Sequence, residues 1–258
     1  MTLIKIDEIK TEDIAKICDH TFLKRPESFA SQAKKEGKGS IAIFRESFTD
    51  FLKETVEMKI KPYAICVRPE EVKNAFRFLQ DNNCGNIKVA SVVGFPDGGY
   101  DTEINVAETR IAIKNGAKEI DMVLNYEQFK NKNFGFVKGD IKAVVEYAHQ
   151  QDVIVKVILE TSELTEEDIK KVCEIANDVG VDFVKTSTGF SASGAKPENL
   201  KIMRDNFKKG VKMSGGVKPE NIKELLKAAS GRDDNCIELD PNKIRIGESG
   251  LLKGEDSY

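Results

Sequence analysis

Eight short apolar runs alternate along the chain with longer segments of helical pattern, and this alternation constrains the fold more than any other feature. The runs have the length of buried strands, and they span residues 16–21, 62–67, 87–95, 119–125, 153–160, 182–187, 211–216 and 243–249. Apolar strands separated by helices form parallel βαβ units. Eight units favour a closed (β/α)8 barrel over a doubly wound sheet, and 258 residues suit one such domain.

Helix-end signals in the intervening segments support the alternation. Thr102 can cap a helix that Gly116 ends, and the expected apolar stripe of this helix is Ile104, Ala107, Ile111 and Ala112. Thr165 and Gly180 are expected as the N-cap and the stop of a second helix. Pro219 suits the first turn of a third helix.

Two segments fit the alternation less well. Residues 25–48 lengthen the first crossover, and we interpret them as an insertion with its own short helix. Residues 253–258 are polar and are expected to form a flexible tail. The whole chain, 1–258, is otherwise interpreted as a single domain.

Charge and composition exclude several classes of protein. Lys plus Arg number 40 and Asp plus Glu number 43, so the net charge is −3, which argues against nonspecific binding to nucleic acids or anionic membranes. The chain shows no signal-peptide pattern and no apolar run of about 18 residues, so we expect a cytoplasmic protein. The five cysteines are scattered without a CxxC pair and are interpreted as reduced thiols.

Five charged residues interrupt the strand runs, namely Lys156, Lys185, Lys212, Asp121 and Asp19. Charged groups are costly in dry surroundings unless they are paired. The five residues lie at or just before the carboxyl ends of predicted strands, where barrels of this kind have their active sites. Structural ion pairing alone remains an alternative for each residue, but five in corresponding positions favour a polar pocket.

A strand lysine can attack a carbonyl only if its amine is neutral. An unperturbed lysine, with a pKa of about 10.4, is neutral about once in 2,500 molecules at pH 7. Burial and a second nearby cation both lower that pKa. Lys185 and Lys212 on adjacent strands can be this nucleophile and its neighbouring cation, and Asp121 can shuttle protons during carbon–carbon bond chemistry.

Glycine-rich stretches follow the last three predicted strands, at residues 186–189, 214–216 and 247–250. Their exposed N–H groups, with the hydroxyl of Ser249, form a natural phosphate cradle. Such turns are common singly, and their coincidence at three adjacent strand ends is what gives the hypothesis weight. The chain contains neither GxxxxGK[ST] nor GxGxxG.

Metal-dependent and hydrolase chemistry have little support. The only histidines are His20 and His149, too few for a histidine-rich zinc site, although carboxylates alone could hold Mg²⁺. No GxSxG elbow of a serine hydrolase is present. His20, beside Asp19, is interpreted as ordering the pocket, and His149 as a surface or core residue.

Seven motifs, in order along the chain, together resemble the deoxyribose-phosphate aldolase family. They are DHTFLK (19–24), ICVRP (65–69), VASVVGFPDG (89–98), AETRIAIKNGAKEIDMVLN (107–125), VKVILET (155–161), DFVKTSTGF (182–190) and KMSGGVK (212–218). The resemblance extends from about Cys18 to Leu252, and the combination is far more specific than any single motif.

The resemblance implies a metal-independent class I aldolase on a TIM barrel, with no cofactor. It implies reversible cleavage of 2-deoxy-D-ribose 5-phosphate to acetaldehyde and D-glyceraldehyde 3-phosphate, and a homodimer or homotetramer. Lys185 would form the Schiff base, Lys212 would perturb its pKa and Asp121 would relay protons. The supporting network would comprise Lys156, Asp19, Thr188 and Cys66, and the phosphate would bind at Gly189, Gly215, Gly216 and Ser249.

Three features depart from the family pattern or extend it. Glu248 stands where similar sequences have a small residue in the last phosphate loop. If its carboxylate pointed into the pocket, it would repel the phosphate. We expect it to point away, in which case phosphate binding is unchanged. The segment 25–48 exceeds the usual spacing. Some family members end in a tyrosine that reaches the active site, so Tyr258 is a candidate for that role.

Two rival functions remain at this point. One is a related Schiff-base aldolase acting on a different aldol substrate, either phosphorylated or unphosphorylated. The other is a noncatalytic barrel that binds sugar phosphates, but such a protein would not need Lys185, Lys212 and Asp121 together.

Overall fold

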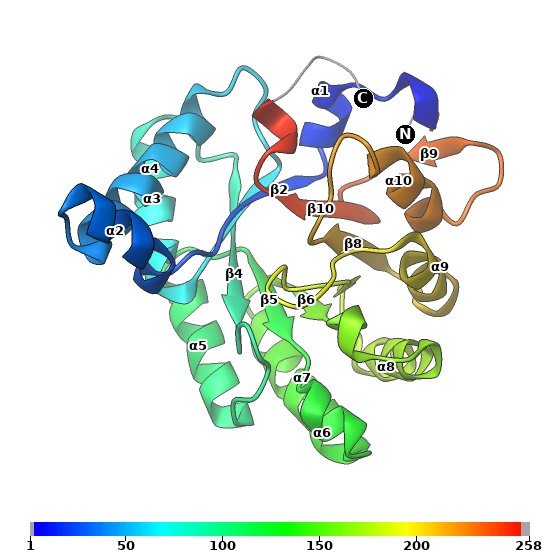
Figure 1. The fold of residues 1–258 in the computed structure, drawn as a ribbon. Coiled ribbons are helices and arrows are strands. Elements are labelled where there is room, and N and C mark those ends of the chain that lie inside the picture. The colour runs from blue at the N-terminus through cyan, green and yellow to red at the C-terminus, as the bar shows by residue number, and fades with distance from the viewer. Residues whose placement is uncertain (1–2, 254–258) are drawn as a thin grey trace.

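Eight parallel strands close into a barrel in the computed structural model, which describes residues 3–253 (Figure 1). Their order around the barrel is β10-β2-β3-β4-β5-β6-β7-β8. The strands are β2 (Cys18–Phe22), β3 (Ala64–Val67), β4 (Lys88–Val93), β5 (Glu119–Val123), β6 (Ile154–Ile158), β7 (Phe183–Lys185), β8 (Gly210–Ser214) and β10 (Ile244–Glu248). Each strand falls on one of the eight predicted runs, so the predicted TIM barrel is confirmed.

Helices surround the strands and bury their outer faces (Figure 1). The longer helices are α3 (Ser40–Glu57), α4 (Val72–Asp81), α5 (Thr102–Lys114), α7 (Phe134–His149), α8 (Glu166–Val179), α9 (Pro197–Asn206) and α10 (Ile222–Ser230). Shorter elements are α1 (Thr11–Ala15), α6 (Tyr126–Lys130) and the 3-10 turns η1 (Ile6–Glu8), η3 (Pro69–Glu71), η4 (Thr161–Glu163) and η5 (Leu251–Lys253). No helix among the described residues is long and apolar enough to cross a membrane.

The predicted helix ends are correct for α8 and are shifted for α10. Thr165 forms a capping box with Asp168, and Gly180 ends α8 in the left-handed conformation at φ 86°. Helix α10 begins at Ile222, so Pro219 precedes the helix instead of lying in its first turn.

The predicted apolar stripe of α5 is wrong at Ile104, Ala107 and Ile111, which are exposed, and right at Ala112, which is buried. Ile104 and Ile111 are about half exposed, whereas Asn105, Thr109 and Ala112 face the interior. The Asn105 amide donates a hydrogen bond of 3.1 Å to the buried Asp140 carboxylate on α7. This polar contact sets the rotation of α5, because a buried carboxylate needs a hydrogen-bond donor. The N-cap of α5 is Asp101, and Thr102 is the first helical residue.

The segment 25–48 contains the expected short helix and the start of a barrel helix. It forms η2 (Pro26–Phe29) and α2 (Ala30–Glu36), and α3 begins within it at Ser40. Phe29 and Ala33 pack against Ile43 and Phe44 of α3, so α2 lies on the outside of this helix (Figure 1). Of the expected tail 253–258, Lys253 ends the 3-10 turn η5, and the other residues, Tyr258 among them, lie outside the described residues.

A small antiparallel sheet was not predicted. It pairs β1 (Leu3–Lys5) with β9 (Cys236–Glu238), with Leu3 opposite Glu238. Each strand has only three residues, which is too short for a periodic signal in the sequence.

Candidate active site

A cavity of about 640 Å³ lies at the carboxyl ends of strands β2, β7, β8 and β10. Its wall includes His20 and Thr21 of β2, Lys185 of β7 and Ser214 of β8. A second cavity, of about 670 Å³, is bordered by the first residues of β6, β7 and β10 and therefore lies at the opposite end of the barrel. Because TIM barrels carry their chemistry at the carboxyl ends of the strands, the first cavity is the candidate active site.

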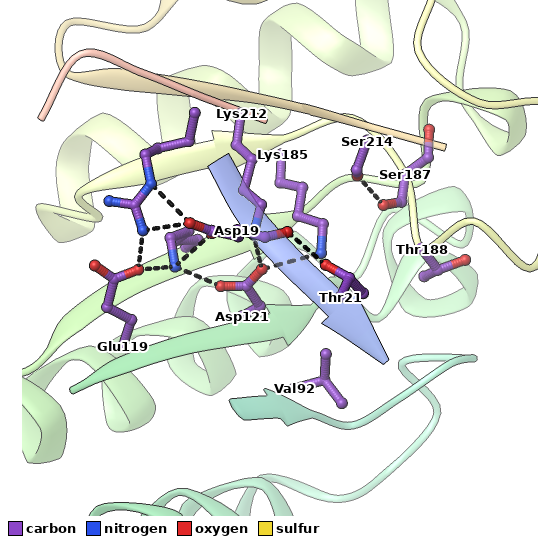
Figure 2. A network of polar contacts seen from close by, with 12 residues as sticks. Asp19, Thr21, Val92, Glu119, Asp121, Lys185, Ser187, Thr188, Lys212 and Ser214 are labelled. Carbon is purple, nitrogen blue, oxygen red and sulfur yellow. Dashed lines mark hydrogen bonds and ion pairs between the residues drawn. The ribbon is translucent and has the colours of Figure 1, made fainter. Parts of the chain in front are cut away.

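Lys185 is the last residue of β7, and its ammonium group is buried at the floor of this cavity. Its Nζ lies 3.0 Å from Oδ2 of Asp121, which projects from β5 into the barrel interior (Figure 2). Successive residues of a strand point to opposite faces. Lys185 therefore points inward, whereas its neighbour Val184 belongs to the main core between barrel and helices.

Asp121 connects three lysines. Its Oδ2 also accepts a hydrogen bond of 2.7 Å from Lys212, and its Oδ1 accepts one of 2.7 Å from Lys156. Lys212 reaches Asp19 Oδ2 as well, at 2.5 Å. The five charged residues singled out in the sequence therefore form one connected cluster in the barrel interior (Figure 2).

Two members of the cluster were missed in the sequence. Arg245 of β10 donates hydrogen bonds to Asp19 Oδ1 and to Glu119 Oε2, and Glu119 also lies 2.6 Å from Lys156. Both residues are fully buried. Arg245 interrupts its strand run as the lysines do, so the same rule would have found it had it been applied to β10. Glu119 is the first residue of β5, at the amino end of the strand, so a rule for carboxyl ends does not select it.

The cluster holds one more cation than it holds carboxylates. Its four potential cations are Lys156, Lys185, Lys212 and Arg245, and its three carboxylates are Asp19, Glu119 and Asp121, so 4 − 3 gives an excess of +1. An unbalanced charge in a dry interior is unfavourable. The excess positive charge is removed if one lysine releases its proton.

Lys185 is the lysine that releases its proton most readily. Burial lowers its pKa, Asp121 opposes this effect, and the neighbouring Lys212 lowers the pKa further. Lys212 behaves in the opposite way: burial alone would lower its pKa, but Asp121 and Asp19 outweigh burial and raise it. The same balance raises the pKa of Lys156, through Asp121 and Glu119.

The two aspartates remain ionised. Burial alone would raise the pKa of Asp121, but Lys156 and Lys212 outweigh it and hold the pKa well below its usual range. For Asp19, Arg245 and Lys212 likewise outweigh burial and lower the pKa. The cluster thus presents fixed carboxylates beside one amine that is easily deprotonated.

Cys66 contributes to an apolar lining inside the barrel. It packs with Ala90, Val92, Val123 and Ile158, and burial raises the pKa of its thiol to about 11. The thiol is therefore neutral at physiological pH and acts as a small apolar group. Cys66 also lies near Lys185, so an apolar group borders the amine on this side.

Thr188 belongs to the loop that follows Lys185. Its backbone N–H donates to Glu160 Oε2 at 3.1 Å, and its hydroxyl donates to the same oxygen. Glu160 is fully buried and adopts a left-handed backbone conformation, at φ 53°. Sequence analysis did not identify Glu160, because its role depends on a contact between residues 28 positions apart.

The four residues expected at the phosphate all line the same cavity: Gly189, Gly215, Gly216 and Ser249. The three glycines have φ values of 84°, 78° and 69°, a region that side chains disfavour. A Cβ on Gly215 would also lie 3.0 Å from Gly194 Cα, so the turn after β8 and the loop after β7 approach closely.

Glu248 is among the residues that line the cavity, and its Oε2 accepts a hydrogen bond from the backbone N–H of Gly250 in the same loop. It is the last residue of β10 and stands opposite His20 in the register of β10 with β2. His20 stacks on Phe51 of α3 with ring centroids 4.7 Å apart. His149 lies elsewhere, at the end of α7, where Nε2 is 2.7 Å from Asp182 Oδ2.

Within residues 3–253, no group of three or more His, Cys, Asp or Glu side chains has an arrangement suited to a metal ion. The carboxylates of the buried cluster already contact ammonium and guanidinium groups. The arrangement as a whole is suited to chemistry by an amine next to fixed charges.

Comparison with known proteins agrees with this geometry. The family model described as "DeoC/LacD family aldolase" matches residues 14–257. The deoxyribose-phosphate aldolase of Aciduliprofundum boonei is 44% identical over 216 residues, which cover 83% of this chain and 87% of the relative. That of Thermococcus kodakarensis is 46% identical over 173 residues, covering 66% and 77%.

Solved structures of aldolases are also similar to this chain. A putative deoxyribose-phosphate aldolase from Coccidioides immitis superposes with a TM-score of 0.69 at 32% identity, covering 97% of this chain and 88% of its own. A structure described as "QR15, an Aldolase" gives 0.72 at 30% identity, covering 93% of both chains. Because the family model matches residues 14–257 and these relatives are similar over most of their length, the chain belongs to the DeoC/LacD family of aldolases.

Proposed function

We propose that this protein is a class I aldolase that reversibly cleaves 2-deoxy-D-ribose 5-phosphate to acetaldehyde and D-glyceraldehyde 3-phosphate through a Schiff base on Lys185. The relatives named for this activity support the substrate. The observation that carries the chemistry is the buried cluster around Asp121, in which Lys185 has a lowered pKa while Lys212 has a raised one.

The reaction begins when the neutral Lys185 amine attacks C1 of the open-chain sugar. Loss of water from the carbinolamine gives an iminium ion, which withdraws electrons from the neighbouring bond. Removal of the proton from the C3 hydroxyl then breaks the C2–C3 bond, releases glyceraldehyde 3-phosphate and leaves an enamine. Protonation of C2 and hydrolysis of the resulting imine release acetaldehyde and restore the amine.

Asp121 and Lys212 are placed to move the protons in these steps. Asp121 Oδ2 contacts both Lys185 and Lys212, so a proton can pass from one ammonium position to the other through one carboxylate. Lys156, Asp19, Glu119 and Arg245 hold the two central residues in place by contacts of their own. The phosphate is assigned to the glycine turns and Ser249.

The test is reductive trapping. The protein is incubated with 2-deoxyribose 5-phosphate, reduced with borohydride, digested and examined by mass spectrometry. An adduct on Lys185, absent in Lys185→Ala and accompanied by acetaldehyde release, is the expected result. Lys201→Ala, which changes an exposed lysine of α9, should trap as the wild type does. A folded wild-type protein that forms no adduct, or forms it on another lysine, would reject the assignment.

The assembly and cellular role follow as further parts of the proposal. Deoxynucleoside breakdown produces a phosphorylated deoxyribose, so we place the reaction in deoxynucleoside catabolism. The exposed Ile104 and Ile111 on α5 support a homo-oligomer, because such apolar side chains favour protein contacts. Light scattering during size-exclusion chromatography tests this point, and a monomer at micromolar concentration would contradict it.

A further inference from the structure

Glu248 lies in the loop to which the phosphate has been assigned. It ends β10 and is followed directly by Ser249 and Gly250. It lines the candidate active site together with Ser249, Gly215 and Gly216. A carboxylate is therefore part of the wall that would receive the phosphate.

The carboxylate of Glu248 also uses a donor of this loop. Its Oε2 accepts a hydrogen bond from the backbone N–H of Gly250. Backbone N–H groups in glycine turns bind phosphates because they present partial positive charge without a side chain in the way. Here one such N–H already holds a negatively charged oxygen that belongs to the protein.

Another part of the cavity wall adds further negative charge. Asp50 and Glu54 project from α3 and line the same cavity, whereas its cationic lining residues are Lys24 and Lys185. With Glu248, three carboxylates face two ammonium groups among the described lining residues. When Lys185 is neutral, as the reaction requires, the imbalance becomes larger. A phosphate dianion enters such a cavity against like charge.

We propose that Glu248 is a specificity-determining residue that weakens the binding of phosphorylated substrates and narrows the preference for them over unphosphorylated 2-deoxy aldoses. The carboxylate competes with the phosphate for the Gly250 N–H and repels its charge. A sugar with a free hydroxyl at C5 meets neither obstacle, so its binding depends less on Glu248. This inference rests on the proposed function for the assignment of the phosphate to this loop.

The first test compares kcat/KM for 2-deoxyribose 5-phosphate and for 2-deoxyribose in three variants. Glu248→Ala should raise the ratio of the two values at least fivefold, mainly through a lower KM for the phosphorylated sugar. Glu248→Gln removes the charge but keeps an oxygen that can accept from Gly250, so its ratio should lie between wild type and Glu248→Ala. Glu220→Ala removes an exposed charge outside the cavity and should keep the wild-type ratio.

A second test does not depend on turnover. The dissociation constant of inorganic phosphate is measured by calorimetry, and Glu248→Ala should lower it at least fivefold relative to wild type and Glu220→Ala. Equal constants in the three proteins, or an unchanged ratio of kcat/KM, would overturn the inference. If the wild type cleaves neither sugar, the proposed function fails, and the phosphate titration still decides the role of Glu248.

Discussion

Lys185 and Lys212 stand opposite each other in register on the neighbouring parallel strands β7 and β8, and their ammonium nitrogens contact the same oxygen of Asp121. Despite this shared oxygen, the pKa of Lys185 is lowered and that of Lys212 is raised. The second carboxylate contact, from Asp19, holds the proton on Lys212, whereas the carboxylate that Lys185 contacts is that of Asp121. The pKa of Lys185 therefore depends on the presence of Lys212.

Replacing Lys212 with Met should move the pH profile of Schiff-base formation to higher pH. In the wild type, the reactive amine appears as pH rises through the pKa of Lys185, which burial and Lys212 lower from the usual 10.5. Without Lys212, this lowering effect is lost and Asp121 Oδ2 keeps Lys185 as its ammonium partner, so both changes raise the pKa of Lys185. At neutral pH the trapping rate should fall about 10²–10⁴-fold, the range for loss of an acid–base group.

The measurement is the initial trapping rate between pH 6 and 10, with Lys201→Met on exposed α9 as the control. A Lys212→Met profile with the wild-type midpoint would show that the neighbouring cation does not tune Lys185.

A methyl group at Gly247 should impair catalysis by pushing on Lys212. A Cβ built there lies 2.9 Å from Lys212 Cε and 3.3 Å from Ser214 Cβ, closer than ordinary van der Waals contact. We expect Gly247→Ala to lower kcat at least tenfold by displacing the Lys212 ammonium from Asp121. Gly139→Ala, in α7 where a Cβ has open space, should keep wild-type kcat. Wild-type kcat in both variants would contradict the expectation.

The barrel was predictable because its signal is local. Eight buried parallel strands are apolar over most of their length, so each could be recognised from its own residues, and the charged interruptions at Lys185 and Asp121 stood out against them. The face that each helix buries was harder to predict from the sequence. Ile104 looks like a core residue in its own segment, but the contact of Asn105 with Asp140, 35 residues away, decides which face of α5 is buried.

The site was predictable as a set of strand positions and not as a network. The chemistry of a lysine nucleophile directed attention to lysines and aspartates, and it passed over Arg245 and Glu119, which support them. Glu160 could not be found, because its backbone conformation and its contact with Thr188 exist only in the folded chain. The direction of Glu248 likewise depends on the fold.

Loss of the Glu160 carboxylate should weaken substrate binding more than it slows chemistry. Glu160 Oε2 fixes both the N–H and the hydroxyl of Thr188, whose loop carries Gly189 into the cavity wall. Glu160→Ala should therefore raise KM several-fold, with a smaller change in kcat. Glu160→Gln keeps an acceptor oxygen and should retain a KM closer to wild type. A KM that is equal in both variants and in wild type would show that this loop holds its place by other contacts.

Removal of the Arg245 guanidinium should destabilise the fold strongly. Arg245 is fully buried and contacts Asp19 and Glu119, so Arg245→Met removes a cation that pairs with two buried carboxylates. Breaking a buried ion pair by removing one partner costs about 3–5 kcal/mol. Urea denaturation followed by circular dichroism should show a free energy of unfolding lower by about that amount. Arg232→Met, which changes an exposed pair with Asp234, should leave the unfolding midpoint near that of the wild type. An Arg245→Met protein as stable as this control would mean that Lys156 and Lys212 alone balance the carboxylates, and that Arg245 has no part in holding Asp19 beside Lys212.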